Sequence, residues 1–373
     1  MKRLLIKANI APSLKKGKYI SGVGRSTTLL LQALAQEKNL PFDVQIYGSG
    51  IRTIGFNFYN LPFKHFSFPI PELIGCEKTT IEPYFRAKCL KYDLFHIPHN
   101  IDRVHKNERF IVTLHDTIGY DTAIKQGDFK TINKWKEMAN RSVGIITCSE
   151  FSKNDIANKL AVSLDKINVI HWGISHENFY IEAPERLNNK LHKLQIGYPY
   201  FLAVSCAHPR KNIPFLLKAF NLFKCRYNTN YRLIVVWSNP PKEILEKYQF
   251  DIKNKNIIFK NYVSDEDLLS LYNGATATIF PSLAEGFGFP ILESFACGTP
   301  VITCNNTSLP EIGQDAAIYT SETDIEEMIE KLCLFTQNTF NLNDFNLKSQ
   351  KVLSQFSWQQ TAKQYINCYK KYL

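Results

Sequence analysis

The chain reads Pro281-Ser282-Leu283-Ala284-Glu285-Gly286-Phe287-Gly288-Phe289-Pro290-Ile291-Leu292-Glu293 immediately after an apolar strand candidate, Ala277 to Phe280. Pro290 suits the first turn of a helix, so the segment 281–293 is predicted to lead from a strand into a helix. Such a connection presents free backbone amides and the positive end of a helix dipole to an anion. Gly286 and Gly288 have no Cβ, which lets a ligand approach the backbone closely.

Two carboxylates flank this predicted anion site, Glu285 on the loop and Glu293 in the first turn of the helix. Carboxylates beside a phosphate are expected to bind another group, because like charges repel, and sugar hydroxyls are the natural candidates. A purely structural helix entry would explain Gly288, Pro290 and Glu293. It leaves Glu285 beside two glycines unexplained.

A second motif follows the strand candidate Phe201 to Cys206 and reads Ser205-Cys206-Ala207-His208-Pro209-Arg210-Lys211-Asn212. Arg210 offers a planar fork and Lys211 a point charge, so the pair is predicted to clamp a diphosphate. The alternative, solvated charges at a helix start, is slightly unfavourable because cations oppose the helix dipole there.

A third motif, Gly22-Val23-Gly24-Arg25, precedes the helical pattern Ser26 to Gln36. Thr27 occupies the place of the third glycine of a dinucleotide fingerprint, and a long loop separates the motif from its strand, so the NAD signal is weak. A glycine loop whose amides touch a phosphate and a simple helix cap both remain open. The sequence has no Walker lysine motif and no H-E-x-x-H pattern.

Short apolar runs alternate with amphipathic stretches along the whole chain, which predicts the α/β class with doubly wound parallel sheets. Polar clusters follow several of these runs, among them His115-Asp116 after Phe110 to Leu114. Ligands collect beyond the carboxyl ends of parallel strands, so these clusters predict a site. The other strand candidates are Leu4 to Ala8, Phe42 to Tyr47, Leu94 to Ile97, Gly144 to Cys148, Ile167 to Ile170, Leu233 to Val236, Ile257 to Phe259 and Val301 to Thr303.

The alternation of apolar runs and amphipathic stretches stops between Ser175 and Pro199, where we place a domain boundary. The prediction is an N-terminal Rossmann-like domain over 1–178 and a C-terminal one over 196–357. The Asn- and Thr-rich stretch Thr336 to Asn346 is interpreted as a loop or a weak helix, and a final helix is predicted from Trp358 to Tyr372.

The 373 residues are 45% hydrophobic, which excludes a disordered or collagen-like chain. No window reaches 18 uninterrupted apolar residues and no signal peptide is evident, so a cytoplasmic location is expected. Nine scattered cysteines without a Cys-x-x-Cys pair favour reduced thiols over a disulfide framework or a zinc site. A net charge of +11 without a basic run argues against nucleic acid as a partner and favours phosphates, nucleotides or an acidic membrane face.

Taken in order, these motifs resemble the large family of retaining glycosyltransferases of GT-B fold usually called family 4. The glycine loop, the Pro209 to Asn212 motif and the Glu285 to Glu293 signature carry the resemblance, with three further matches: Val112-Thr113-Leu114-His115-Asp116, Thr147-Cys148-Ser149-Glu150-Phe151-Ser152 and Val169-Ile170-His171-Trp172-Gly173. Two departures are Trp172-Gly173, where many relatives carry Asn-Gly, and Ser21-Gly22, where they carry Gly-Gly.

The resemblance implies two Rossmann-like doubly wound domains that face each other across a cleft, with the segment 358–373 packed back on the first. The second domain would hold a GDP-sugar or UDP-sugar, and the first a glycan or lipid-linked acceptor. The implied reaction moves a mannose-like or glucose-like hexose in surface polysaccharide or glycolipid synthesis, without a metal or other cofactor. The leaving phosphate itself would help to deprotonate the acceptor.

Carried over residue by residue, the resemblance implies that Arg210 and Lys211 neutralise the leaving diphosphate. Glu293 would bind the ribose hydroxyls, and Glu285 the transferred sugar. His115 would lie near the sugar and the acceptor, although by itself it fits a hydrogen-bonded histidine at a strand end. The expected catalytic set is thus His115, Arg210, Lys211 and Glu285, and the expected nucleotide-sugar set is Gly22, Gly24, Ser205, Gly286, Phe287, Gly288, Phe289 and Glu293.

Two other classes of function stay open. A GT-B enzyme resembling UDP-N-acetylglucosamine 2-epimerase would share the architecture but need no acceptor. A non-catalytic protein that binds anionic ligands would explain the charge but not the Glu285 to Glu293 pattern. A peripheral contact with the inner face of the cytoplasmic membrane is a further hypothesis. It rests on aromatic residues interleaved with cations in the N-terminal half: Phe58, Phe63, Phe66, Phe68, Tyr84 and Phe85.

Overall fold

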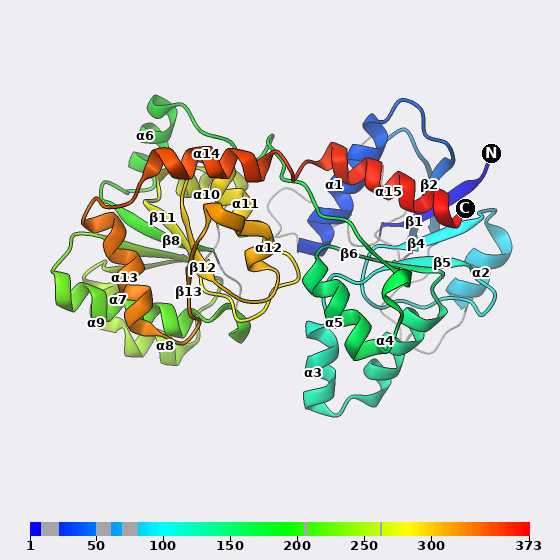
Figure 1. The fold of residues 1–373 in the computed structure, drawn as a ribbon, viewed down its shortest axis with the longest axis horizontal. Coiled ribbons are helices and arrows are strands. Elements are labelled where there is room, and N and C mark those ends of the chain that lie inside the picture. Colours follow the sequence, from blue (N-terminus) through cyan, green and yellow to red (C-terminus); the bar gives the residue numbers. More distant parts are fainter. Residues whose placement is uncertain (9–21, 50–60, 69–80, 205–207, 262) are drawn as a thin grey trace. The chain divides into compact units, whose positions relative to one another are not determined.

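The computed structural model describes residues 1–8, 22–49, 61–68, 81–204, 208–261 and 263–373 (Figure 1). The chain divides into two compact units. Unit 1 comprises Met1–Gly173 together with Ser357–Leu373, and unit 2 comprises Ile174–Phe356. Each unit contains one parallel sheet covered by helices, so the predicted α/β class is confirmed.

Unit 1 has a seven-stranded parallel sheet in the order β3-β2-β1-β4-β5-β6-β7. Its central strands are almost entirely buried, as expected for a sheet covered on both faces, and Leu4, Leu5 and Ile6 are fully buried. The strands are β1 (Arg3–Lys7), β2 (Asp43–Ser49), β3 (Lys64–Phe68), β4 (Leu94–Ile97), β5 (Phe110–Thr113), β6 (Gly144–Thr147) and β7 (Ile167–Val169). The helices are α1 (Gly22–Gln36), α2 (Ile81–Cys89), α3 (Ile118–Gln126), α4 (Phe129–Arg141), α5 (Glu150–Leu160) and α15 (Trp358–Tyr372), with a short 3₁₀ helix at Leu164–Lys166.

Unit 2 has a six-stranded parallel sheet in the order β10-β9-β8-β11-β12-β13. The strands are β8 (Tyr200–Val204), β9 (Arg232–Val236), β10 (Ile257–Lys260), β11 (Ala277–Phe280), β12 (Val301–Cys304) and β13 (Ile318–Thr320). The helices are α6 (Pro184–Lys193), α7 (Ile213–Tyr227), α8 (Lys242–Lys247), α9 (Gln249–Lys253), α10 (Asp265–Gly274), α11 (Phe289–Ala296), α12 (Leu309–Gly313), α13 (Ile325–Thr336) and α14 (Leu342–Leu353), with 3₁₀ helices at Pro209–Lys211 and Gln314–Ala316. Phe201 of β8 anchors the core through ring contacts with Phe220, Phe223 and Phe335.

The structure draws the boundary between the units at Gly173 and Ile174, earlier than the predicted limit at residue 178, and again at Phe356 and Ser357. The segment that follows Ile174 is held in unit 2 by Glu182, whose buried carboxylate accepts a hydrogen bond from Ser270 of α10 at 2.7 Å. The predicted weak helix or loop at Thr336 to Asn346 resolves into the end of α13 and the start of α14.

Helix α15 completes unit 1, although it lies far along the chain from the other elements. It packs against α1, as Figure 1 shows in red and blue. The Tyr369 hydroxyl lies 2.8 Å from Nδ1 of the fully buried His96, whose Nε2 lies 2.8 Å from Oγ1 of Thr113. A Cβ on Gly144 of β6 would come within 2.5 Å of the Tyr372 ring, so any side chain at this position would force that ring to shift.

The two points where the chain crosses between the units are tied to each other. A Cβ on Gly173 would lie 2.2 Å from the backbone nitrogen of Trp358, so the strand-end loop and the start of α15 touch through their backbones. On the unit 2 side, the Ile174 amide donates to the Phe356 carbonyl at 3.0 Å. Within the described residues, no helix has both the length and the apolar character to cross a bilayer.

Tyr369→Phe tests the role of α15 in unit 1. The substitution leaves Nδ1 of His96 without a partner, and an unsatisfied buried group costs about 1–3 kcal/mol. We expect the free energy of unfolding in urea to fall by about that amount. Tyr84→Phe, at a residue that is 55% exposed, is the matched control and should be neutral. Equal stability of both variants would contradict the proposed role of the Tyr369 hydroxyl.

Candidate functional site

The loop between β11 and α11 has the strand-to-helix geometry predicted from the sequence. Gly288 has φ +114°, a backbone conformation that disfavours any side chain, and a Cβ there would lie 3.1 Å from Cδ2 of Leu309. The helix begins directly after it at Phe289, with Pro290 in its first turn. The free amides of this first turn therefore lie at the carboxyl edge of the unit 2 sheet, where ligands of doubly wound folds bind.

Glu285 forms a compact ion cluster with both cations of the predicted clamp. Its Oε2 lies 2.5 Å from Nη1 of Arg210, and its Oε1 lies 2.6 Å from Nζ of Lys211. The Ser282 hydroxyl donates to the same Oε1 at 2.6 Å. Burial alone would raise the pKa of this carboxyl, but the charges of Lys211 and Arg210 outweigh it and hold the pKa below its usual range. The carboxylate is therefore ionised at neutral pH.

Backbone contacts fix this cluster from both sides. The Arg210 carbonyl accepts hydrogen bonds from the Leu283 amide at 2.7 Å and from the Ser282 hydroxyl at 3.1 Å. Nη1 of Arg210 in turn donates to the Ala284 carbonyl at 2.8 Å. The loops after β8 and β11 are thus joined, which is possible because these two strands are neighbours in the sheet.

Glu293 lies in α11 with only 5% of its surface exposed. The Tyr272 hydroxyl donates to its Oε2 at 2.8 Å, which fixes the orientation of the carboxylate. Since hydroxyl groups of a ligand can donate to a carboxylate in the same way, this position can bind a diol.

The remaining predicted residues of unit 2 have mixed outcomes. Ser205 lies outside the described residues. Phe287 is 3% exposed and its ring packs 5.1 Å from that of Phe289 and 6.0 Å from that of Phe356. Its side chain therefore belongs to the core of the loop. The Ser308 hydroxyl donates to the carbonyls of Glu285 and Phe287 and supports the loop from behind.

In unit 1, Gly22 and Gly24 lie inside the first turn of α1, whereas the sequence placed them in a loop before the helix. Within this helix the hydroxyls of Ser26 and Thr27 donate to the Val23 carbonyl and that of Thr28 to the Gly24 carbonyl. Among the described residues, nothing lies within 4 Å of a Cβ added at Gly22.

His115 follows β5 and is 5% exposed, with its ring 5.0 Å from that of Trp172. Its Nε2 lies 3.0 Å from the Pro98 carbonyl, and since a carbonyl can only accept, Nε2 carries the proton. Burial lowers the pKa of His115 to about 4, with the Pro98 carbonyl opposing the shift, so the imidazole is neutral at physiological pH. Nδ1 is buried and has no hydrogen-bond partner among the described residues. Asp116 beside it accepts from the Ile118 amide at 2.9 Å and starts α3.

Several supporting residues carried no signal in the sequence. Tyr272 lies in an ordinary amphipathic helix, and Ser308 lies outside every motif. Ser282 is inside the quoted segment, but its hydroxyl has no distinctive spacing. Only the strand order, which brings the loops after β8, β11 and β12 to one edge, could have identified them.

The aromatic residues expected at a membrane surface divide into two groups. Phe66 and Phe68 pack against the apolar core of unit 1, and Phe68 contacts Phe85 at 4.3 Å. Tyr84 is exposed, and Phe58 lies outside the described residues. The membrane contact stays a prediction, with fewer aromatic residues available to it than the sequence indicated.

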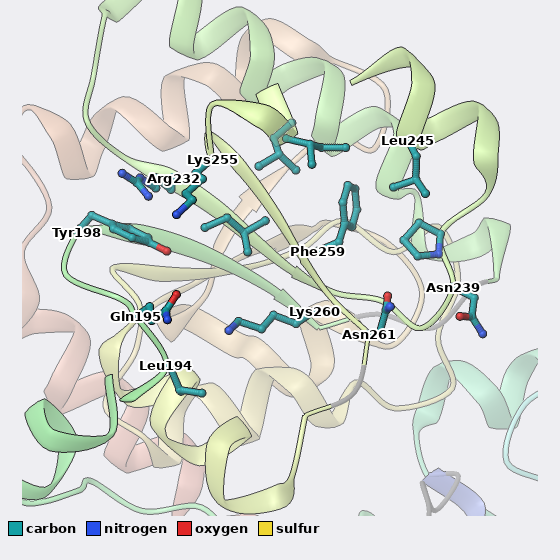
Figure 2. Close-up of a pocket in the computed structure, with 14 residues that line it drawn as sticks. Leu194, Gln195, Tyr198, Arg232, Asn239, Leu245, Lys255, Phe259, Lys260 and Asn261 are labelled. Atoms are coloured by element: carbon teal, nitrogen blue, oxygen red, sulfur yellow. The ribbon is translucent and has the colours of Figure 1, made fainter. Parts of the chain in front are cut away.

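A pocket of about 570 Å³ lies along the edge strand β10 of unit 2 (Figure 2). Arg232 lies over the ring of Tyr198 at one end, and Asn239 and Asn261 line the other. None of the predicted site residues lines it. Within the described residues, no group of three His, Cys, Asp or Glu side chains could hold a metal ion.

Comparison with known proteins finds relatives of both parts of the chain. The family model described as glycosyl transferases group 1 matches residues 187–352, and the model described as glycosyltransferase family 4 matches residues 20–178. The O-antigen chain mannosyltransferase B of Escherichia coli is 29% identical over 291 residues, which cover 74% of this chain and 72% of the relative. The serotype-specific mannosyltransferase WbdA of Escherichia coli is 28% identical over 240 residues. These residues are 62% of this chain but only 29% of that relative.

Among solved structures, HepE of Anabaena in complex with UDP and glucose superposes with a TM-score of 0.73 at 13% identity, covering 100% of both chains. The two parallel sheets and this likeness define the GT-B fold. The chain belongs to the group 1 glycosyltransferases, glycosyltransferase family 4.

Glu285→Gln tests the ion cluster. Breaking a fully buried ion pair costs about 3–5 kcal/mol, and because Arg210 and Lys211 are 24% and 12% exposed we expect a loss of about 1–3 kcal/mol at pH 7. The folded-state pKa lies below the ordinary value of 4.5, so the wild-type advantage should persist above that pH and shrink as the pH falls through and below it. Unfolding in urea at a series of pH values measures this.

Glu326→Gln removes the exposed partner of Arg226 and serves as the control, with little change at any pH. If the stability advantage of the wild type over the Glu285→Gln variant grew as the pH fell, the assignment of an ionised Glu285 would be wrong.

Proposed function

We propose that this enzyme transfers a hexose with retention of configuration from a nucleotide diphosphate sugar to a glycan or lipid-linked acceptor. The observation that carries the proposal is the cluster of Arg210, Lys211 and Glu285 beside the first turn of α11. A mannose donor is favoured because the relatives are named mannosyltransferases, and a glucose donor stays open because HepE holds UDP and glucose. The names of the O-antigen relatives support a role in surface polysaccharide or glycolipid synthesis.

The two cations would stabilise the negative charge that develops on the diphosphate as the sugar departs. Such stabilisation is effective when the charges are already in place before the reaction, because no reorganisation is then needed. Glu285 holds both side chains in position, while 24% of the Arg210 side chain and 12% of Lys211 stay accessible to a ligand. The diphosphate would meet these accessible faces and the amides of the α11 first turn together.

Glu293 would bind the ribose hydroxyls, and the hydrogen bond from Tyr272 would orient its carboxylate for this. The amides of Gly286 to Phe289 and the Glu285 cluster would position the transferred sugar. In unit 1, Gly22 and Gly24 would let the diphosphate approach the first turn of α1, and neutral His115 would accept a hydrogen bond from a sugar hydroxyl through Nδ1.

In the proposed reaction, the acceptor oxygen attacks the anomeric carbon on the face that the diphosphate leaves. The bond from the anomeric carbon to the phosphate oxygen breaks, and that leaving oxygen takes the proton of the acceptor hydroxyl. The products are the extended glycan and a nucleoside diphosphate.

A thermal-shift screen with GDP- and UDP-sugars tests the proposed function. We expect one nucleotide sugar to raise the melting temperature of the wild type, and Glu293→Gln to lose most of that shift because the ribose contact is gone. Product analysis with the matching donor alone distinguishes transfer from epimerisation of the donor. No shift with any nucleotide sugar, or a C2 epimer formed without an acceptor, would overturn the proposal.

Arg210→Ala and Lys211→Ala test the clamp. Removing one preorganised charge-stabilising group typically lowers turnover by about a hundredfold or more, and we expect that loss for each variant at saturating donor. Lys218→Ala, at an exposed position of α7, is the matched control. Turnover close to that of the wild type in both clamp variants would show that these cations do not act on the leaving group.

A further inference from the structure

A second buried ion cluster lies in unit 1 and has no part in the proposed donor site. Nζ of Lys7, at the end of β1, lies 2.6 Å from Oδ2 of Asp102, and Nε2 of His99 lies 3.1 Å from the same oxygen. The Arg103 amide donates to the other carboxylate oxygen at 2.7 Å. The exposed fractions of the Lys7, Asp102 and His99 side chains are 7%, 11% and 18%.

The position of this cluster is that of a ligand site. Strands β1 and β4 are parallel neighbours, with Ile6 opposite His96, so Lys7 and the residues after Ile97 share the carboxyl edge of the sheet. Ligands of doubly wound sheets bind at this edge. Burying charged side chains is unfavourable, and replacing them with apolar residues is often neutral or stabilising, so the cluster is not explained by stability alone.

The cluster orients the His99 ring. Burial alone would raise the pKa of Asp102, but Lys7 and His99 outweigh it and keep the carboxylate ionised. An ionised carboxylate can only accept, so Nε2 of His99 carries a proton directed at Asp102. In the neutral ring Nδ1 is then a hydrogen-bond acceptor, and this atom is buried with no partner in the part of the chain that the structure describes.

The ring nitrogens of His115 are arranged like those of His99. The Pro98 carbonyl holds Nε2–H of His115, so that Nδ1 of His115 is likewise an unpartnered acceptor. The two rings follow β4 and β5, which are parallel neighbours in the sheet. Two neighbouring residues, Pro98 and His99, therefore place two unpaired acceptor nitrogens at the ends of β4 and β5.

We propose that Nδ1 of His99 accepts a hydrogen bond from a hydroxyl of the acceptor glycan, and that Asp102 is the positioning residue that keeps Nε2 protonated. A sugar supplies several O–H donors at once, which matches two unsatisfied acceptors. The acceptor glycan is chosen over the donor sugar because the Asp102 cluster belongs to unit 1, whereas the diphosphate clamp belongs to unit 2. This inference rests on the proposed function and adds a contact for its acceptor.

Two substitutions at His99 separate the proposed contact from a structural role. Asn places an acceptor oxygen near the position of Nδ1 but cannot reach Asp102, whereas Gln places an N–H near the position of Nε2 but has no acceptor at Nδ1. If Nδ1 binds substrate, His99→Asn keeps more activity than His99→Gln. If the contact with Asp102 only stabilises the fold, the order is reversed.

The assay uses labelled donor and membranes of the source organism from which the gene has been deleted, since these retain the unextended acceptor. We expect His99→Gln to lose about tenfold or more in label transferred to the lipid extract, as for loss of one hydrogen bond, and His99→Asn to lose clearly less. Hydrolysis of donor in the absence of membranes should stay at the wild-type level in both. His176→Gln, at an exposed histidine, is the control and should behave as the wild type.

Unchanged transfer by His99→Gln, or His99→Gln more active than His99→Asn, would overturn the inference. A loss of donor hydrolysis in parallel with transfer would also overturn it, because the contact would then serve the donor or the fold. Failure of the wild type itself to transfer label counts instead against the proposed function.

Discussion

The buried carboxylate of Glu285 is the contact on which the organisation of unit 2 depends at its carboxyl edge. It draws Arg210 from the loop after β8 and Lys211 from the same turn onto the loop after β11. Two like charges so close together would repel each other, and the carboxylate between them makes their proximity possible. The same ion pairs fix the loop that ends at Gly288, and with it the direction in which the first amides of α11 point. The ion pairs of Glu285 therefore fix both the positions of the two cations and the conformation of the loop.

The carboxyl edge of the unit 1 sheet carries a different set of polar groups. Three histidines, His96, His99 and His115, lie in β4 or just after β4 and β5. His99 and His115 each have one ring nitrogen held by a fixed partner, Asp102 or Pro98, and His96 has both nitrogens held, by Thr113 and Tyr369. Burial lowers the pKa of His96 to about 3 and that of His115 to about 4, so these two rings act as neutral hydrogen-bonding groups. Unit 2 thus presents cations that stay partly accessible, and unit 1 presents neutral imidazoles beside the paired charges of Lys7 and Asp102. This division suits a reaction in which one substrate is a polyanion and the other offers a neutral hydroxyl.

The sequence predicted the buried strands well, because apolar runs between polar clusters have few alternative interpretations. It did not predict β3, whose residues Lys64–Phe68 are only half buried, or the three-residue β13. The residues of the 281–293 segment were recognised from their pattern, yet the ion pairs between Glu285 and the two cations were not. They join residues about 75 positions apart, and only the pairing of β8 with β11 makes them neighbours. His99 was recognised only as part of the polar cluster His96 to His99 at the end of a strand, and no role was assigned to it. A histidine after a proline has no distinctive spacing, and its role depends on Lys7 and Asp102.

The insertion of unit 2 between the parts of unit 1 has a consequence for synthesis of the protein. Domains usually fold in the order in which they leave the ribosome. Here all the strands of unit 1 emerge first, but His96, Phe42 and Gly144 stay without the cover of Tyr369 and Tyr372 until α15 has been made. Unit 2 is one continuous segment that ends at Phe356, before α15 begins. The second unit can therefore reach its native packing while the first still exposes apolar surface. For a nascent chain of this protein, the N-terminal half is the part that most needs protection from aggregation.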